Sequence, residues 1–105
     1  MMTKVEWTEF ASNRWQEVAE DIFQEFGYVS LQKFAEATES WIQRVGEQPT
    51  IGAYEPLLRH RKIQYRHLII TKLTKLIYYI ENDTVIIVHV WDTRREPIKL
   101  DNEIF

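Results

Sequence analysis

Apolar residues in the first half of the chain recur at steps of three and four, which is the period of an amphipathic helix. One stripe spans residues 11–26 and stops before Gly27, a residue type that commonly ends helices. A second stripe spans residues 31–45, for which we expect Ser30 as the N-cap and Gly46 as the stop. Because so few residues separate the two stripes, they predict an antiparallel helical hairpin.

The pattern changes after residues 46–56, a stretch with two Gly and two Pro that we interpret as a loop. Segments rich in Ile, Val and Tyr, which favour β-strands, then cover residues 62–70, 75–81 and 84–91. Asn82-Asp83 fits a two-residue hairpin turn between the last two, and residues 4–7 predict one more short strand. The order β-α-α-β-β-β predicts an α+β fold with the helical hairpin on one face of an antiparallel sheet.

Length and composition favour one globular domain covering residues 1–105. With 45% hydrophobic residues and 13% aromatic residues, the chain has enough apolar area for a core. No stretch approaches the roughly 20 apolar residues of a membrane span, and the first residues lack the order of a signal peptide. Since there are no cysteines, disulfides and thiolate zinc sites are excluded, and a cytoplasmic location is expected.

Charge is distributed unevenly along the chain, although the net charge is only −3. Residues 1–54 carry four basic and nine acidic side chains, and residues 76–105 carry three basic and six acidic ones. Residues 55–75 carry six basic side chains against Glu55 alone, a balance of +5. The middle of the chain therefore predicts a local basic patch on a mildly acidic protein.

The sequence contains no pattern of residues that predicts a metal or a cofactor site. His60, His67 and His89 are the only imidazoles, and none has a neighbouring ligand at metal-binding spacing. A glycine-rich phosphate loop and a G-x-S-x-G elbow are both absent. We therefore expect neither a metal nor a cofactor.

The basic residues suggest a surface that binds a partner or a nucleic acid. Arginine suits phosphates and carboxylates because its planar guanidinium presents paired donors. The candidates are Arg59, Arg61, Lys62, Arg66, Lys72 and Arg95, together with the aromatic Trp91. The alternative is a charged sheet edge that prevents aggregation, and Trp91 can equally cover the rim of the core.

Acid–base cleavage of RNA is one possible use of such a surface, because it needs a base, an acid and cations that stabilise the phosphorane. His67 or His89 can be the base, Lys72 or Lys75 the acid or a stabilising cation, and Arg94 a stabilising cation. No recognisable motif fixes any pair of these residues. Catalysis and simple binding both remain open at this point.

The stretch HVWDTRREP, residues 89–97, changes abruptly from apolar to charged. Strand alternation predicts that His89 and Trp91 face the opposite side of the sheet from Val88 and Val90. We expect Asp92 to hold one of the following arginines by a paired hydrogen bond.

The chain resembles the RelE/ParE superfamily, the toxins of bacterial type II toxin–antitoxin (plasmid stabilisation) systems. Three stretches carry the resemblance, namely VEWTEFA, YEPLLRHRKIQYRHLIITKLTKLIYYI and VIIVHVWDTRREPIKL. Their order and spacing are the specific feature, and they cover nearly the whole chain. The resemblance implies a compact sheet with a helical hairpin and a groove that binds a cognate antitoxin.

The resemblance also implies two kinds of activity. RelE-like members cleave mRNA in the ribosome, whereas ParE-like members poison DNA gyrase. Lys75 takes the place of a catalytic Arg before the apolar run LIYYI, and Arg94 matches the arginine after the last strand. A catalytic C-terminal Tyr has no counterpart in KLDNEIF, and the chain is acidic where ribosome-directed members are basic.

These departures favour a ParE-like toxin that inhibits growth by binding an essential target such as gyrase. Two alternatives are a ribosome-dependent mRNA endoribonuclease and a non-toxic protein of the same fold that only binds an antitoxin. In the nuclease alternative, Lys75, Arg94 and His67 are the catalytic candidates. The expected partners are the antitoxin and either gyrase or the ribosome with its mRNA, with no membrane involved; a homodimer or a toxin–antitoxin hetero-oligomer is the expected assembly.

Overall fold

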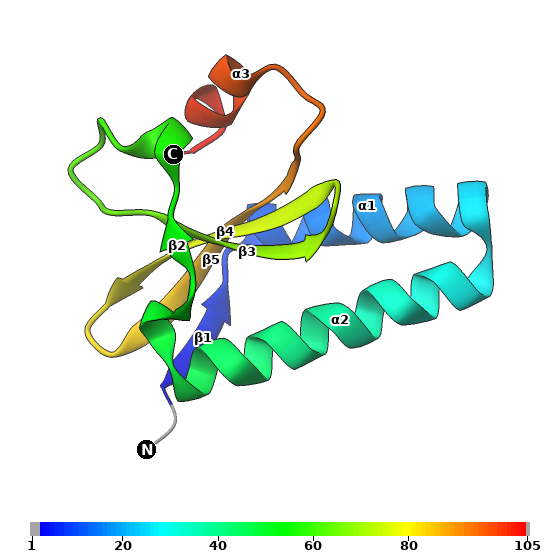
Figure 1. Ribbon diagram of the computed structural model, residues 1–105, viewed down its shortest axis with the longest axis horizontal. Coiled ribbons are helices and arrows are strands. Elements are labelled where there is room, and N and C mark those ends of the chain that lie inside the picture. The colour runs from blue at the N-terminus through cyan, green and yellow to red at the C-terminus, as the bar shows by residue number, and fades with distance from the viewer. Residues whose placement is uncertain (1–2, 105) are drawn as a thin grey trace.

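A mixed β-sheet with helices on both faces forms the described part of the chain, residues 3–104 of a computed structural model (Figure 1). The strands are β1 (Lys4–Trp7), β2 (Ala53–Tyr54), β3 (Arg66–Thr71), β4 (Thr74–Glu81) and β5 (Thr84–Asp92). The α-helices are α1 (Glu9–Phe26), α2 (Tyr28–Glu47) and α3 (Pro97–Asn102), and the short 3-10 helices are η1 (Pro49–Ile51) and η2 (Pro56–Leu58). None of the described helices is long and apolar enough to cross a membrane.

The sheet has the strand order β1-β5-β4-β3-β2. Strands β2 to β5 pair antiparallel, as expected, whereas β1 runs parallel to β5. The predicted antiparallel pairing therefore holds for β2 to β5 but is wrong for β1, which the helical hairpin connects to β2 at the opposite edge of the sheet. The predicted turn between β4 and β5 is confirmed, since Asn82 and Asp83 both have positive φ, 48° and 61°, as a type I′ turn requires.

The helical hairpin is confirmed, but its second helix begins and ends differently from the prediction. Gly27 has φ 92° and ψ −176°, a conformation open to glycine, and it reverses the chain within one residue. Helix α2 therefore starts at Tyr28, and Ser30 lies inside its first turn instead of capping it. Gly46 is buried within α2, which continues to Glu47. At the other end of the hairpin, the Thr8 hydroxyl caps α1 by accepting the Ala11 N–H at 3.1 Å.

The hairpin packs on one face of the sheet and forms the larger core, the hairpin-side core. Its sheet residues alternate along the strands, with Leu76 and Tyr78 from β4 and Val85 and Ile87 from β5, all fully buried. The Trp15 ring of α1 stacks on Phe34 of α2 at 5.3 Å between ring centroids. The two helices are therefore joined to each other as well as to the sheet.

A second, smaller core lies on the opposite face of the sheet, beneath η2 and α3. It consists of Leu58, Tyr65, Ile77, Trp91, Leu100 and Ile104. Trp91 is 1% exposed, so of the two roles considered for it, packing is the one that the structure supports. Helix α3 is not among the elements predicted from the sequence. This helix supplies Leu100 to the second core, and Ile104, four residues after Leu100, also belongs to it.

The alternation expected for the end of β5 holds for Trp91 and Val90, which lie in different cores, but it is wrong for Val88 because a β-bulge interrupts the strand there. Ile77 pairs with His89, but its neighbour Tyr78 pairs with Ile87, which leaves Val88 as an extra residue. Val88 consequently packs on the second core with Trp91, whereas Val90 lies in the hairpin-side core. The two valines therefore lie on opposite faces of the sheet.

The segment between α2 and β3 differs from the predicted loop followed by a strand. Residues 62–65 are not part of a strand, and β3 begins at Arg66. Strand β2 adds a fifth strand inside the predicted loop. Gly52 is required here, because a Cβ at this position would lie 2.6 Å from both the His67 carbonyl oxygen and the Tyr78 hydroxyl. That hydroxyl accepts the Gly52 N–H at 2.9 Å and donates to the Pro49 carbonyl at 2.7 Å.

Candidate functional site

The predicted basic patch is divided between the two faces of the sheet. Lys75 and Ile77 alternate with the hairpin-side residues Leu76 and Tyr78, so they point toward the second core. Arg94 follows the end of β5 and lines a groove on the hairpin side. The structure therefore brings Lys75 together with His67 but does not bring either of them to Arg94.

Lys75 and His67 meet a buried carboxylate that the sequence analysis did not select. Glu55 is 1% exposed, and its Oε1 accepts a hydrogen bond from Lys75 Nζ at 2.5 Å. His67 Nδ1 lies 3.0 Å from the same oxygen without forming a regular hydrogen bond to it. The second oxygen, Oε2, accepts the Leu57 N–H at 2.9 Å. We call Glu55, His67 and Lys75 the buried triad.

The charge of Glu55 is well stabilised within this triad. Burial by itself raises the pKa of Glu55, but the contacts of its carboxylate with His67, Lys75 and the Leu57 N–H outweigh that effect and lower the pKa from 4.5 to about 2. The carboxylate is consequently ionised at neutral pH and balances the cation of Lys75. Both candidate catalytic groups on this face are thus engaged in an internal contact.

Two other predicted cations hold the C-terminal segment against the sheet. Arg61 Nε donates to Asp101 Oδ1 at 2.8 Å, and its Nη2 donates to the Asp101 and Ile104 carbonyls. The Arg95 guanidinium forms a bidentate ion pair with the Glu103 carboxylate, and its Cζ lies 4.8 Å from the centre of the Trp91 ring. These residues have structural partners within the chain.

Glu103 also binds His89, which is fully buried. Burial lowers the pKa of His89 below 6.5 even though the nearby Glu103 carboxylate opposes that shift. The neutral ring donates its Nε2–H to Glu103 Oε1 at 2.8 Å, because a carboxylate can only accept. Hydrogen bonds from Arg95 lower the pKa of Glu103 to about 2 despite its partial burial. His89 is therefore a structural histidine and not an accessible base.

The remaining predicted cations lie around the short strand β2 and the turn between β3 and β4. The Arg66 guanidinium lies 4.1 Å from the centre of the Tyr54 ring and donates to the Gly52 carbonyl at 2.7 Å. Arg59, Lys62 and Lys72 are exposed, and none of them forms an ion pair with a described residue. Arg59 and Arg66 line two adjoining hollows that share Tyr54, whereas Lys72 lies in the turn between β3 and β4.

Arg94 is the predicted site residue whose surroundings best suit contact with a partner. Its side chain is 66% exposed. As expected from the sequence, Asp92 holds it by a paired hydrogen bond, with Nε to Oδ1 at 3.1 Å and Nη2 to Oδ2 at 2.9 Å. This contact with Arg94 lowers the pKa of Asp92 and raises that of Arg94. The guanidinium is oriented in this way, and its remaining N–H groups are available.

The groove beside Arg94 lies between the half of the helical hairpin that ends at the Gly27 turn and the turn between β3 and β4. It has a volume of about 520 Å³, and we call it the inner groove. Its floor is apolar, with Val18, Ile22 and Phe34, and Arg14 and Lys33 join Arg94 among the residues around it. Acidic Asp21 and Glu25 also line it. This mixture suits a segment of protein better than a small charged molecule.

The described residues offer little for metal chemistry. Within residues 3–104, no group of three or more His, Asp or Glu side chains is arranged to hold a metal ion. What the arrangement provides is an oriented arginine next to an apolar groove.

Three residues that matter to the architecture of this region escaped the sequence analysis: Glu55, Asp101 and Glu103. Glu55 is the single acidic residue in the basic stretch 55–75, and that isolation was a usable signal for a buried counter-ion. For Asp101 and Glu103, the signal was Pro97 at the first turn of a helix, followed by Leu100 and Ile104 at helical spacing.

Comparisons with known proteins agree with the fold and the family resemblance. A family model described as "ParE toxin of type II toxin-antitoxin system, parDE" matches residues 5–97. A solved structure titled "Chromosomal ParDE TA system from P. aeruginosa" is similar with a TM-score of 0.69 and 13% identity, covering 87% of this chain and 96% of that one. The structure of a YoeB dimer from Staphylococcus aureus is similar with a TM-score of 0.55 and 12% identity, covering 87% and 97%. No curated protein sequence matches the chain.

Proposed function

The chain belongs to the ParE toxin family of type II toxin–antitoxin systems, and from this premise we propose that it inhibits growth by binding an essential protein and is neutralised by a cognate antitoxin. DNA gyrase is the first candidate target. Arg94 and the inner groove are the proposed contact surface.

The observation that carries this proposal is the separation of the candidate catalytic groups. A nuclease needs its base, its acid and its stabilising cation around one phosphate. His67 and Lys75 lie with Glu55 on the face of the second core, whereas Arg94 lines the inner groove on the hairpin side. The separation supports binding without cleavage.

The internal contacts of the cations support the same conclusion. Lys75 is held by a buried carboxylate, and Arg61 and Arg95 are paired with Asp101 and Glu103. Side chains that are already paired within the chain are less available for contact with a substrate. Arg94 remains largely exposed, although Asp92 orients it.

The proposal is tested by inducing the protein in growing bacteria and following DNA damage and mRNA together. We expect growth arrest with DNA breaks and an SOS response, while mapped mRNA ends stay unchanged. The purified chain should also inhibit supercoiling by purified gyrase. Co-expression of a cognate antitoxin should restore growth.

Arg94→Ala should relieve the arrest, and Lys4→Ala is its matched control. Lys4 is 71% exposed and pairs with Glu6 two residues away, as Arg94 pairs with Asp92. Equal loss of toxicity in both variants would show that general surface charge, and not the inner groove, is responsible.

Other outcomes identify the alternatives. Messenger RNA cut within translating ribosomes, with DNA left intact, would establish the ribosome-dependent endoribonuclease. Unimpaired growth together with tight antitoxin binding would establish a non-toxic antitoxin-binding protein. Either result contradicts the gyrase proposal.

A further inference from the structure

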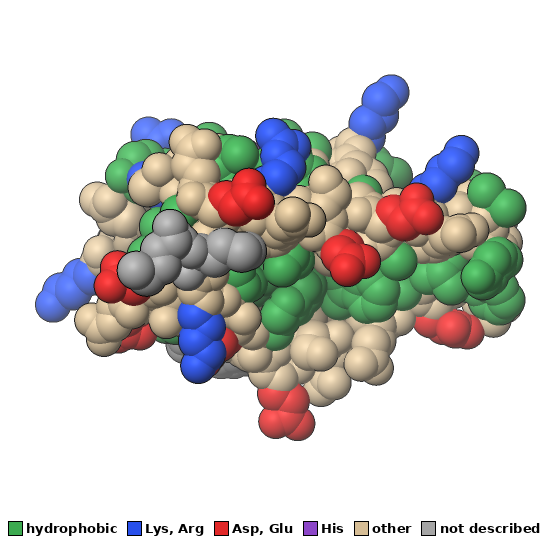
Figure 2. Space-filling model, turned by 90° about the horizontal axis from the view of Figure 1, so that it is seen from below, with side chains coloured by type: hydrophobic (Ala, Val, Ile, Leu, Met, Phe, Trp, Pro, Cys, Tyr) green, Lys and Arg blue, Asp and Glu red, His purple; other side chains and the backbone are tan. Residues whose placement is uncertain are grey.

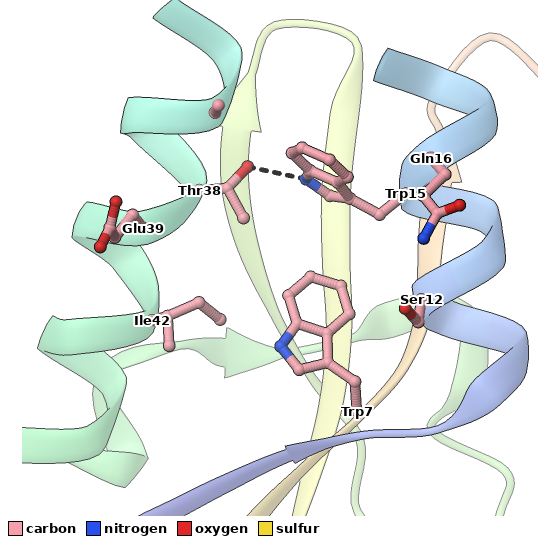
Figure 3. Close-up of a pocket in the computed structure, with 8 residues that line it drawn as sticks. Trp7, Ser12, Trp15, Gln16, Thr38, Glu39 and Ile42 are labelled. Carbon is pink, nitrogen blue, oxygen red and sulfur yellow. Dashed lines mark hydrogen bonds between the residues drawn. The ribbon is translucent and has the colours of Figure 1, made fainter. Parts of the chain in front are cut away.

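A second groove lies between α1 and α2 on the side of the hairpin that faces away from the sheet. At its β1 end, Trp7, Trp15 and Ile42 surround a hollow of about 480 Å³. Figure 3 shows the Trp7 ring between Ser12 of α1 and Ile42 of α2, with Trp15 above it. The Trp15 Nε1–H is occupied by the Thr38 hydroxyl at 3.0 Å, so this ring is fixed in place.

The hollow continues toward the tip of the hairpin. A second hollow of about 440 Å³ shares Trp15, Gln16 and Ala35 with the first and extends to Tyr28 and Leu31. Figure 2 shows a band of apolar side chains running along this side of the molecule toward the tip. We call the two hollows together the outer groove.

The outer groove is distinct from the inner groove. The residues that line the inner groove include Val18, Ile22 and Arg94, and none of its lining residues belongs to the outer one. Small residues give the outer groove its depth, because Ala35 lies at its centre, where the two hollows join. Tyr28 is 66% exposed at its tip end.

Acidic side chains border the outer groove. Glu39 of α2 lines the hollow at the β1 end, and Glu20 of α1 lines the one toward the tip. The two helices together carry eight acidic and three basic side chains, a balance of −5. Acidic side chains are visible on both sides of the apolar band in Figure 2. The surroundings are therefore negative, whereas the groove itself is apolar and aromatic.

We propose that the outer groove receives an amphipathic helix of a partner protein, with an apolar face bordered by Lys and Arg. Burying aromatic and aliphatic side chains between two helices would complete a three-helix arrangement. The acidic rim would then pair with the basic residues of the incoming helix. Trp7 and Trp15 are the expected anchors, because large rigid aromatic rings dominate binding energy at interfaces.

The charge on the hairpin decides between the possible occupants. A second copy of the chain would bring two helical hairpins of −5 each into contact, and like charges across an interface oppose association. A basic helix removes that repulsion. Since the groove follows α1 from Ser12 to the turn before Tyr28, it is roughly 24 Å long, which corresponds to about 16 residues of helix.

The test uses three synthetic 18-residue peptides and the full chain. One is an amphipathic helix of Leu and Lys, the second has Glu in place of Lys, and the third has the Leu/Lys composition with the order scrambled. Titration calorimetry measures their affinities, and amide chemical shifts locate the binding site. We expect the Leu/Lys helix to bind at least about tenfold more tightly than the other two, and more weakly as salt is added.

Two variants test the groove itself. Glu20→Lys/Glu39→Lys reverses the rim charges and should weaken binding of the Leu/Lys helix by roughly tenfold, because two attractions become repulsions. Ala35→Gln, a neutral and helix-compatible change, should weaken it by filling the centre of the groove. The matched control is Glu36→Lys/Glu47→Lys, which makes the same charge change at exposed α2 positions outside the groove.

Each contrary result overturns the inference. Equal weakening by the control would mean that only the overall charge attracts the peptide, and no binding of the Leu/Lys helix would mean that the groove is not a helix site. A dimer that Ala35→Gln dissociates would assign the groove to a second copy. None of these results bears on toxicity, because growth arrest and gyrase inhibition are measured separately and concern Arg94.

Discussion

The two faces of the sheet are covered in different ways. On the hairpin side, two long helices bury an apolar layer that includes Phe34, Leu76 and Val85. On the opposite side, short segments bury a smaller apolar cluster and add ion pairs, among them the contact of Glu55 with Lys75. The hairpin side is stabilised mainly by apolar packing, whereas the opposite side is stabilised by apolar packing together with ion pairs.

The second face shows how ion pairs can fix a short segment to a sheet. A helix of six residues such as α3 buries too little area to stay in place by apolar packing alone. Arg61 and Arg95 compensate by binding Asp101 and Glu103, which lie between Leu100 and Ile104 in the chain. The two faces should consequently respond differently to mutation, to pH and to the loss of single hydrogen bonds.

The largest effect is expected from Phe34→Ala on the hairpin side. Phe34 is 3% exposed and stacks on Trp15, so the substitution leaves a cavity between the helices and should cost about 4 kcal/mol. Urea unfolding followed by circular dichroism measures this loss. The loss should be the same at pH 7 and pH 3, because no titrating group is involved. A clear dependence of this loss on pH would contradict the view that the hairpin side is stabilised mainly by apolar packing.

Glu55→Gln should cost about 3 kcal/mol at pH 7, because it leaves the buried charge of Lys75 without a counter-ion. The loss should shrink as the pH falls from 4.5 toward 2, where Glu55 of the wild type becomes protonated as well. Glu81→Gln is the exposed control and should stay within about 0.5 kcal/mol of the wild type. A neutral result for Glu55→Gln would show that the pair does not stabilise this face.

Acid should weaken the wild type chiefly through this second face. The folded pKa of Glu55 lies below its unfolded value of 4.5, so its contribution is complete above pH 4.5 and is lost as the pH falls toward about 2. That loss is on the order of 3 kcal/mol for Glu55 alone. Glu103 acts in the same direction, and buried His89 adds a loss that starts below pH 6.5.

Urea titrations at a series of pH values measure this acid dependence. Glu55→Gln should flatten the curve between pH 4.5 and 2, whereas Phe34→Ala should shift it down without changing its shape. Parallel curves for the two variants would contradict the assignment of the acid sensitivity to the buried triad.

The smallest effect is expected from Thr38→Val, which keeps the shape of the side chain and removes the hydroxyl that binds Trp15. The half-buried indole N–H is then left without its partner, at a cost of about 1 kcal/mol. Thr93→Val, at an exposed position after β5, should change stability by less than about 0.5 kcal/mol. Equal losses of unfolding free energy in Thr38→Val and Thr93→Val would show that the hydrogen bond between the helices does not stabilise the fold.

The same contrast explains which parts of the structure were predictable from the sequence. The hairpin and strands β4 and β5 follow from local periodicity, because each buries one continuous stripe or face. The start of α2 was misplaced because Gly27 reverses the chain without help from Ser30. The bulge at Val88 was unpredictable, since it depends on the pairing partner and not on the strand's own pattern.

The candidate site was harder to predict because its geometry depends on contacts between distant residues. The pair of Arg94 with Asp92 is local, and it was expected from the sequence. Lys75 and Glu55 are twenty residues apart, and Arg61 and Asp101 forty, so no local pattern joins them. The cations do not form the single patch that was predicted. Strand alternation points Lys75 toward the second core, whereas Arg94 lines the inner groove on the hairpin side.

The parallel pairing of β1 with β5 has a consequence for biosynthesis. Lys4 pairs with Thr84 and Trp7 with Ile87, so the first strand made by the ribosome has to wait for the last one. The helical hairpin can form early from local contacts, whereas the sheet closes only when β5 has emerged. A nascent chain truncated before residue 84 would therefore display a helical hairpin without its sheet partner, and it should be degraded or bound by chaperones instead of acting as a partial toxin.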